Sequence, residues 1–310
     1  MRIVRLFGCP VARLAAVVLV GGSAFAWEGP KLTRDKSAPA SARTWSDVKA
    51  AVAASIAKTG EGYFAYSRKY NDIGPIDTSG TLTDEELHTQ FALACVLASP
   101  ITVNGATVKP QLEKWIADKA LMNVNNDFVG RQGHVVAERD GTLVIAKYLW
   151  GMNGGSVAVA FYNPTDAARK VSATARELCL AGTVKWTNRF DPSEKGEFAD
   201  ALAFDVPAHG AKLVMLSGKP VMRETYRPEC AVVKNGATVF DCIFVPKDGD
   251  YRLSVETAGA VSYKVRVNGL VAGAFKGPAA LDVRLLEPEN RISLEGLPQD
   301  ALKVLCVTAK

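Results

Sequence analysis

The sequence is poor in the residues that most often build metal and nucleotide sites. It has 3 histidines, and His88, His134 and His209 are too widely spaced to suggest a zinc-ligand motif. It contains no Gly-x-Ser-x-Gly turn and no glycine-rich phosphate loop. These absences argue against a metallohydrolase, a serine hydrolase of the α/β type and a nucleotide-dependent enzyme. Neither a metal nor any other cofactor is expected.

Apart from one stretch near the N-terminus, the sequence also lacks a long apolar run. That stretch, Leu14 to Val20, is too short to span a bilayer as a helix. Arginines precede it and the small-x-small triplet Ala24-Phe25-Ala26 follows it, as in an export signal. The sequence therefore predicts a signal peptide over residues 1–26, a secreted or periplasmic location, and no membrane attachment after cleavage.

Charge of one sign is not concentrated anywhere along the chain. The net charge is +5, and it falls close to zero once the arginines of the signal peptide are removed. A nucleic-acid-binding protein would carry a basic stripe, and none occurs. Nucleic acid is therefore not an expected partner.

The cysteine count leaves at least one thiol unpaired, because five cysteines follow the signal peptide. Cys95 lies in an apolar helical stretch and is expected to be a buried free thiol. Cys230 with Cys242, or either of them with Cys306, would form a bridge near the C-terminus. The sequence does not choose between these pairings or assign a partner to Cys179.

The first part of the mature chain shows little periodicity. Residues 27–44 are rich in Pro, Ser, Ala and Lys, which predicts a linker. Ser46 is the expected N-cap of a helix that runs to Lys58 and stops at Gly60. Residues 63–66 are expected to form a short strand.

The clearest helix start in the sequence is at Thr83. Thr83 and Glu86 have capping-box spacing, and the acidic residues between them suit the positive end of the helix dipole. From Phe91 onward the helix is apolar nearly all round, and a proline ends it. A strand at 101–103 and a helix beginning at Pro110 follow. This alternation is typical of α/β-barrel units.

Beyond Gly133 the apolar residues alternate with a period of two. The pattern predicts one antiparallel β-sandwich over 137–219 and a second, smaller one over 220–310. Tyr251 and Tyr263 lie on the apolar phase of their strands, which favours a place in the core over a sugar-binding face. Asn268-Gly269 predicts a hairpin turn. The strands expected in the first sandwich are 143–149, 156–162, 182–186 and 212–216.

Several segments of residues 70–133 stand in a distinctive order: Asn71-Asp72, Leu82 to Glu86, Phe91 to Pro100, Asn125 to Asp127, and Gly130 to Gly133. In this order they resemble the melibiase-type α-galactosidases, the retaining glycoside hydrolases that remove terminal α-galactose. The resemblance extends to Gly218, through the all-β domain that follows the barrel in that family. The last unit loosely resembles a carbohydrate-binding module.

The resemblance implies two catalytic carboxylates, both placed before the segment matched here, and neither motif is found in this chain. Of the family's Trp-Asn-Asp-Pro-Asp-Met segment only Asn71 and Asp72 carry over, because Tyr70, Gly74 and Pro75 replace the Trp, the second Asp and the Met. No catalytic residue is therefore expected. Asp72 is either a residual sugar-site residue or a strand-end aspartate that holds a turn.

Trp150 completes the expected substrate-binding residues, beside Asn71 and Asp72. It precedes the glycine-rich stretch 151–155 and is expected near a hairpin tip. There it is either a sugar-stacking platform or an ordinary packed or singly exposed aromatic residue.

The barrel implied by the resemblance does not fit in this chain. A closed (β/α)₈ barrel takes roughly 200 residues or more, and residues 45–136 offer less than half of that. The open strand edges and the all-round apolar helix after Thr83 call for neighbours that the chain is not expected to encode. Three explanations compete: a truncated or degenerate gene copy, a remnant docked on the following sandwich, or a protein partner or second copy that covers the open edge.

The expected fold class is multidomain α+β and mainly β, with an incomplete (β/α) barrel remnant at 45–136 followed by two antiparallel β-sandwiches. The expected function is that of an α-galactosidase-family relative that is inactive alone because it lacks the catalytic half. The alternative is a secreted, non-catalytic carbohydrate-binding or scaffold protein. An α-galactoside-type carbohydrate is the expected ligand.

Overall fold

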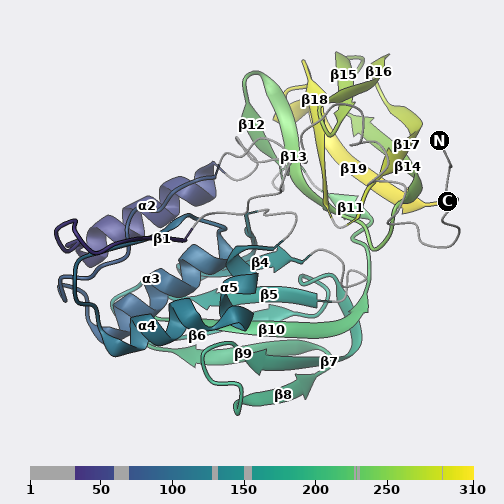
Figure 1. Cartoon of the computed structure of the whole chain (residues 1–310). Helices are drawn as coiled ribbons and strands as arrows, with labels where there is room; N and C mark the ends of the chain where they lie inside the picture. Colours follow the sequence, from purple (N-terminus) through teal and green to yellow (C-terminus); the bar gives the residue numbers. More distant parts are fainter. Residues whose placement is uncertain are drawn as a thin grey trace, which may run out of the picture.

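The protein consists mainly of antiparallel β-sheets, with few helices, as the sequence predicted. The computed structural model describes residues 32–58, 70–127, 132–149, 156–226, 228, 231–287 and 289–310. Within these residues there are four α-helices, and none of them is long and apolar enough to cross a membrane. Figure 1 shows their arrangement. The helices are α2 (Trp45–Ala57), α3 (Asp84–Val96), α4 (Pro110–Ala117) and α5 (Lys119–Asn125). The strands are β1 (Leu32–Asp35), β2 (Ile101–Asn104), β3 (His134–Arg139), β4 (Thr142–Tyr148), β5 (Ser156–Tyr162), β6 (Arg169–Thr174), β7 (Leu180–Asn188), β8 (Lys195–Phe198), β9 (Ala201–Val206), β10 (Ala211–Pro220), β11 (Thr225–Tyr226), β12 (Val232–Lys234), β13 (Ala237–Phe244), β14 (Gly249–Thr257), β15 (Ser262–Val267), β16 (Leu270–Lys276), β17 (Ala279–Leu285), β18 (Glu289–Glu295) and β19 (Leu302–Ala309).

The largest sheet, called the central sheet below, has six antiparallel strands in the order β3-β4-β5-β10-β7-β8. The four strands predicted for this region correspond to β4, β5, β7 and β10. Strand β5 is buried along its whole length because both faces of the sheet are covered. Ala158 and Ala160 face the helices, whereas Val157 and Val159 face the β6–β9 pair on the other side. Burial on both faces explains why β5 is apolar at every position after Ser156 rather than at every second one.

The C-terminal unit encloses a separate core between two sheets, ordered β11-β19-β14-β17 and β12-β13-β18-β15-β16. The predicted alternation is confirmed, because Tyr251 in β14 and Tyr263 in β15 are both buried. Their hydroxyl groups donate to the carbonyls of Lys247 and Gly277, so both tyrosines belong to the core. The predicted hairpin at Asn268-Gly269 joins β15 to β16, with positive φ at both residues.

Helix α3 begins with the predicted capping box. Thr83 Oγ1 accepts from the backbone N–H of Glu86 at 3.2 Å, and Glu86 Oε2 accepts from the backbone N–H of Thr83 at 3.0 Å. The helix ends at Val96 with Leu97 as its C-cap; Ala98 then takes a positive φ of 50°, and Pro100 follows. Strand β2 then begins, as the sequence predicted.

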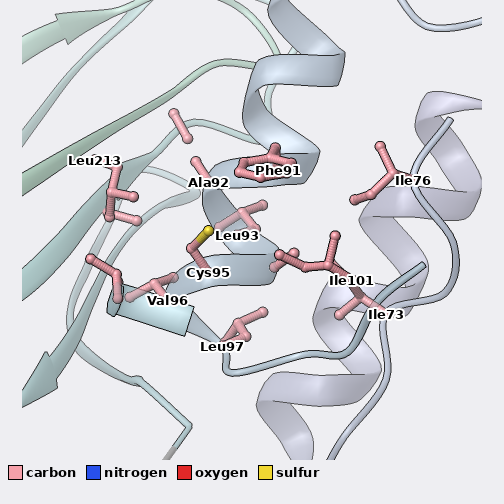
Figure 2. Packing of buried hydrophobic residues seen from close by; sticks show 14 of the residues in the cluster. Ile73, Ile76, Phe91, Ala92, Leu93, Cys95, Val96, Leu97, Ile101 and Leu213 are labelled. Carbon is pink, nitrogen blue, oxygen red and sulfur yellow. The ribbon is translucent and has the colours of Figure 1, made fainter. Parts of the chain in front are cut away.

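Contrary to expectation, the neighbours of α3 all come from this chain. Figure 2 shows Leu213 of β10 on one side of α3, and Ile73, Ile76 and Ile101 on the opposite side. Phe91 is completely buried between these groups. The expectation that the apolar helix needs neighbours from elsewhere is therefore wrong, because the central sheet and the segment around β2 cover it. Helices α3, α4 and α5 lie over one face of that sheet (Figure 1).

Part of the predicted linker is also regular structure. Residues 32–35 form β1, which pairs in parallel with β2, and Gly105 N donates to Asp35 O at 2.9 Å. The pairing partner lies more than 60 residues away, so composition alone gave no sign of it. Helix α2 begins after Thr44 rather than Ser46 because only Thr44 has an acidic residue, Asp47, three positions on to complete a capping box. The predicted signal peptide and the strand at 63–66 lie outside the described residues.

The C-terminal unit contacts the central sheet through an aromatic pair and a histidine–carboxylate pair. Tyr148 of β4 lies against Phe244 of β13, with ring centroids 4.6 Å apart and the rings tilted by 32°. His134 Nδ1 of β3 lies 3.3 Å from Glu289 Oε1 of β18, and both side chains are largely buried. These contacts join the units across β3, β4, β13 and β18.

The described cysteines are free thiols. Cys95 is buried, as expected, and Cys179 and Cys306 are also unpaired. A bridge that uses Cys306 is therefore excluded in this structure. Cys230 and the side chain of Cys242 lie outside the described residues.

Replacing Phe91 with Ala should lower the free energy of unfolding by about 3–5 kcal/mol, because a large cavity would open between the sheet and β2. Urea titration monitored by circular dichroism measures this change. Leu270→Ala is the matched control. Leu270 is 77% exposed on β16, so its loss should cost less than about 0.5 kcal/mol. Equal costs for the two variants would contradict the proposed position of the core.

The thiols should differ in reactivity in the folded protein. Burial raises the pKa of Cys95 to about 12, although the nearby Lys147 ammonium acts in the opposite direction. Burial also raises the pKa of Cys179. Because the thiolate is the reactive form, iodoacetamide should label the half-buried Cys306 well before Cys95. Peptide mass spectrometry gives the order, and labelling of Cys95 at the rate of Cys306 would show that α3 is not packed as described.

Candidate functional site

The parallel strands β1 and β2 indicate where a site should be sought. In α/β barrels the functional residues lie at the C-terminal ends of the parallel strands and in the loops that follow them. Here β1 ends at Asp35 and β2 ends at Asn104, and residues 36–44 connect β1 to α2. A third extended segment runs beside β2 in the same direction, with Ile73 N bonded to Ser99 Oγ and Ile76 N bonded to Thr102 O.

Asn71 and Asp72 lie at the opposite end of this arrangement, beside the start of β2. Asn71 Nδ2 donates to Lys58 O at 3.1 Å and to Gln132 Oε1 at 2.7 Å. Asp72 Oδ1 accepts from Gly74 N at 2.8 Å and from Ser99 Oγ at 3.3 Å. Both residues thus tie loops together, and the geometry of Asp72 matches the turn-holding alternative. Trp150, the third predicted site residue, lies outside the described residues.

Asp77 occupies the C-terminal end of the third segment, and sequence analysis did not single it out. Its carboxylate is buried and accepts four hydrogen bonds, one from a side chain and three from the backbone. The donors are Arg43 N, Ser79 Oγ, Gly80 N and Leu82 N, at 2.8–3.2 Å. The signal was present in Asp77-Thr78-Ser79-Gly80, a typical sequence for an Asx turn. The turn leads directly into the capping box of α3.

The connection from β1 to α2 places Arg43 and Asp47 near Asp77. Arg43 Nη1 donates to Ile73 O at 3.1 Å and lies over Gly74, where a Cβ atom would come within 2.1 Å of that nitrogen. The φ of 86° at Gly74 favours glycine, and a larger residue there would also displace the Arg43 guanidinium. The Asp47 carboxylate is exposed in the first turn of α2, which follows the connection from β1.

Hydrogen bonds keep the pKa values of two carboxyl groups at this end low. The side-chain hydrogen bond from Thr44 lowers the pKa of Asp47, with smaller contributions from the Thr44 backbone and the Arg43 charge. The Ser37 hydroxyl and the backbone N–H groups of Ser37 and Ala38 lower the pKa of Asp35. Both groups are ionised at neutral pH. A general acid requires the opposite, a raised pKa that retains the proton.

The chain itself covers this end of the strands. Ser41 N donates to Thr78 Oγ1 at 2.8 Å, and Thr78 N donates back to Ser41 O at 2.8 Å. Asn104 Nδ2 reaches Ser41 Oγ at 3.2 Å. Residues 37–43 therefore cross the strand ends and hold them by backbone bonds. In the part of the chain that the structure describes, no group of three or more His, Cys, Asp or Glu residues is arranged to hold a metal ion.

Asp77→Ala should lower the free energy of unfolding by more than about 2 kcal/mol, because donors at the edge of the core lose a charged acceptor. Asp72→Ala is the matched comparison and should cost about 1 kcal/mol, because Asp72 is exposed and accepts only two bonds. Urea titration of both variants measures the difference. A larger loss in Asp72→Ala would reverse the structural roles assigned to the two aspartates.

The sequence matches no protein-family profile and no curated protein. Solved structures are similar at low identity. A GH27 β-L-arabinopyranosidase from Geobacillus stearothermophilus is 16% identical with a TM-score of 0.50, and the match covers 56% of this chain and 42% of that one. An α-galactosidase I from Mortierella vinacea is 17% identical with a TM-score of 0.48, covering 62% and 53%. The α-galactosidase of Saccharomyces cerevisiae is 15% identical with a TM-score of 0.46, covering 61% and 59%.

At these identities the similarity concerns the fold alone, and the arabinopyranosidase carries it because its TM-score reaches 0.50. The chain spans about half the length of the solved structures it matches. Over more than half of its own length, this protein resembles the melibiase-type glycoside hydrolases of family GH27 in fold.

Proposed function

We propose that this protein is a relative of the melibiase-type α-galactosidases that does not hydrolyse α-galactosides by itself. In this view β1, β2 and the helices are the remnant of a barrel, the central sheet with the β6–β9 pair is the following β-sandwich, and the C-terminal unit is a second one. One observation carries the proposal: the carboxylates of Asp35, Asp47 and Asp77 accept hydrogen bonds from backbone N–H groups.

Retaining hydrolysis requires two carboxyl groups about 5–5.5 Å apart on either side of the sugar bond, one of which must retain a proton. Asp77 is buried and accepts four hydrogen bonds, so it offers no free face to a sugar. Asp35 and Asp47 have lowered pKa values, which supports ionised rather than protonated forms. The residues at this end therefore suit stability better than acid catalysis.

The small number of parallel strands supports the same proposal. A barrel site is built by loops from eight strands, and β1 pairs with β2 alone among the described strands. Residues 37–43 also lie across the end where a sugar would enter. Asp47 is the group best placed to contact a ligand, because it is exposed at the start of α2.

The competing role, non-catalytic carbohydrate binding, receives little support from the C-terminal unit. Sugar-binding faces usually present exposed aromatic rings, and Tyr251 and Tyr263 are buried with their hydroxyl groups bonded. Trp150 remains the aromatic residue to test, by glycan binding to the parent chain and to Trp150→Ala.

The purified chain should release no nitrophenol from nitrophenyl-α-galactoside above a blank. Asp47→Asn and Asp72→Asn should behave as the parent does, and thermal melting should show that both variants are folded. Turnover by the parent that either folded variant loses would overturn the proposal and would identify the carboxylate responsible.

A further inference from the structure

His209 occupies a turn that faces the beginnings of two helices. The turn joins β9 to β10, and His209 has a positive φ of 58°. Its backbone N–H donates to Thr165 O at 3.2 Å, which fixes the turn against the loop between β5 and β6. Histidine is one of the few non-glycine residues that adopt this backbone region readily.

The imidazole ring contacts three elements that are distant in sequence. Nδ1 lies 2.7 Å from Glu86 Oε1 in the first turn of α3, and Nε2 lies 2.8 Å from Asp166 Oδ1 in the β5–β6 loop. The ring also stacks on Trp45, the first residue of α2, with centroids 4.8 Å apart and an angle of 19°. The His209 side chain is 24% exposed and Glu86 is 13% exposed.

Both ring nitrogens face carboxylate oxygens, and this determines the protonation state that fits. A neutral imidazole carries one N–H, so one nitrogen would point its lone pair at a carboxylate. Protonated imidazole donates from both nitrogens and forms two charge-assisted hydrogen bonds. The observed distances therefore suit the imidazolium ion.

We propose that His209 is a pH-dependent clasp that, when protonated, holds the N-terminal ends of α2 and α3 on the central sheet. The clasp is firm in mildly acidic solution and loosens as the ring loses its proton. Trp45 lies between Thr44 and Asp47, which form the capping box of α2. Loosening of the contact between His209 and Trp45 therefore also affects the start of α2. This inference is independent of the proposed function.

The charged groups around His209 act in both directions. Glu85 of α3 lies near the turn, since its Oε1 would be 2.9 Å from a Cβ atom at Gly210. Lys49 of α2 acts on Asp166 and lowers its pKa, although the hydrogen bond from His209 contributes most to that shift. The positive ends of the α2 and α3 dipoles oppose the imidazolium charge.

The balance of these effects favours the charged ring. Burial by itself lowers the pKa of His209, but the hydrogen bonds that the ring donates to Asp166 and Glu86 outweigh it, and the pKa lies above the ordinary value of 6.5. Burial raises the pKa of Glu86, yet its bonds with Thr83 and His209 bring it below the usual value. Glu86 and Asp166 therefore remain ionised while the ring is protonated.

The sign of the pH dependence follows from these shifts. A group with a raised pKa in the folded state binds protons more tightly there than in the unfolded chain. The stabilisation is fully present below the unfolded value of about 6.5, and it is lost as the pH rises through the folded pKa. It also declines in strong acid, where Glu86 and Asp166 are protonated.

Titration of the histidine ring signals by NMR tests the clasp in the whole protein. His209→Asn assigns the signal among the three histidines and suits the positive φ. In the parent, His209 should titrate above 6.5, and Asp166→Asn should lower that pKa by about half a unit or more. The control is Asp200→Asn, at an exposed aspartate directly before β9. It should leave the pKa of His209 unchanged. Titration at or below 6.5 in the parent, or no shift in Asp166→Asn, would overturn the proposal.

Thermal melting provides a second measurement, which does not depend on signal assignment. The parent should melt at a higher temperature than Asp166→Asn and His209→Asn at pH 6, and the difference should shrink at pH 8.5. Asp200→Asn should follow the parent at both pH values. If His209→Asn does not fold, Asp166→Asn alone decides, because Asp166 is 91% exposed and its replacement leaves the core intact. A difference that is equal at both pH values would contradict a protonation-dependent clasp.

Discussion

The burial of α3 from Thr89 to Val96 is the constraint on which the rest of the architecture depends. Its residues form one continuous core with the central sheet on one side and the segment around β2 on the other. Because the helix is apolar nearly all round, it is stable only when several neighbours cover it at once. The central sheet supplies the cover that a closed barrel would otherwise give. The parallel pair β1–β2 is therefore held in place by the same core that buries the helix.

The carboxylates near the strand ends accept hydrogen bonds from backbone N–H groups. Asp77 collects donors from the turn that leads into α3, Asp47 caps α2, and Asp35 holds the residues after β1. The hydrogen bonds to Asp35 and Asp47 lower the pKa of both carboxyl groups, which favours the ionised form and disfavours proton donation. Residues 37–43 close over the same end. This arrangement suits a structural role for a surface that would be a ligand site in a complete barrel.

Two histidine side chains contact carboxylates of neighbouring elements. His209 links the helices to the turns of the central sheet, and His134 approaches Glu289 of the C-terminal unit. An imidazole at such a boundary makes the strength of the contact depend on pH in a range where other side chains keep a constant charge. The hydrophobic clusters hold the units together, and the proposed clasp adds a pH-dependent contact at His209.

The sequence by itself determined the elements whose signals are local. The capping box of Thr83 and Glu86, the Asn268-Gly269 turn and the alternating strands follow from interactions between residues close in the chain. Only the tertiary structure decided the pairing of β1 with β2 and the burial of α3 against Leu213, because these contacts join residues far apart in sequence. In the candidate site, the local sequence pattern of an Asx turn marks Asp77. The end of the strands at which this aspartate lies depends on strand direction. That direction is set by long-range packing, which no local pattern encodes.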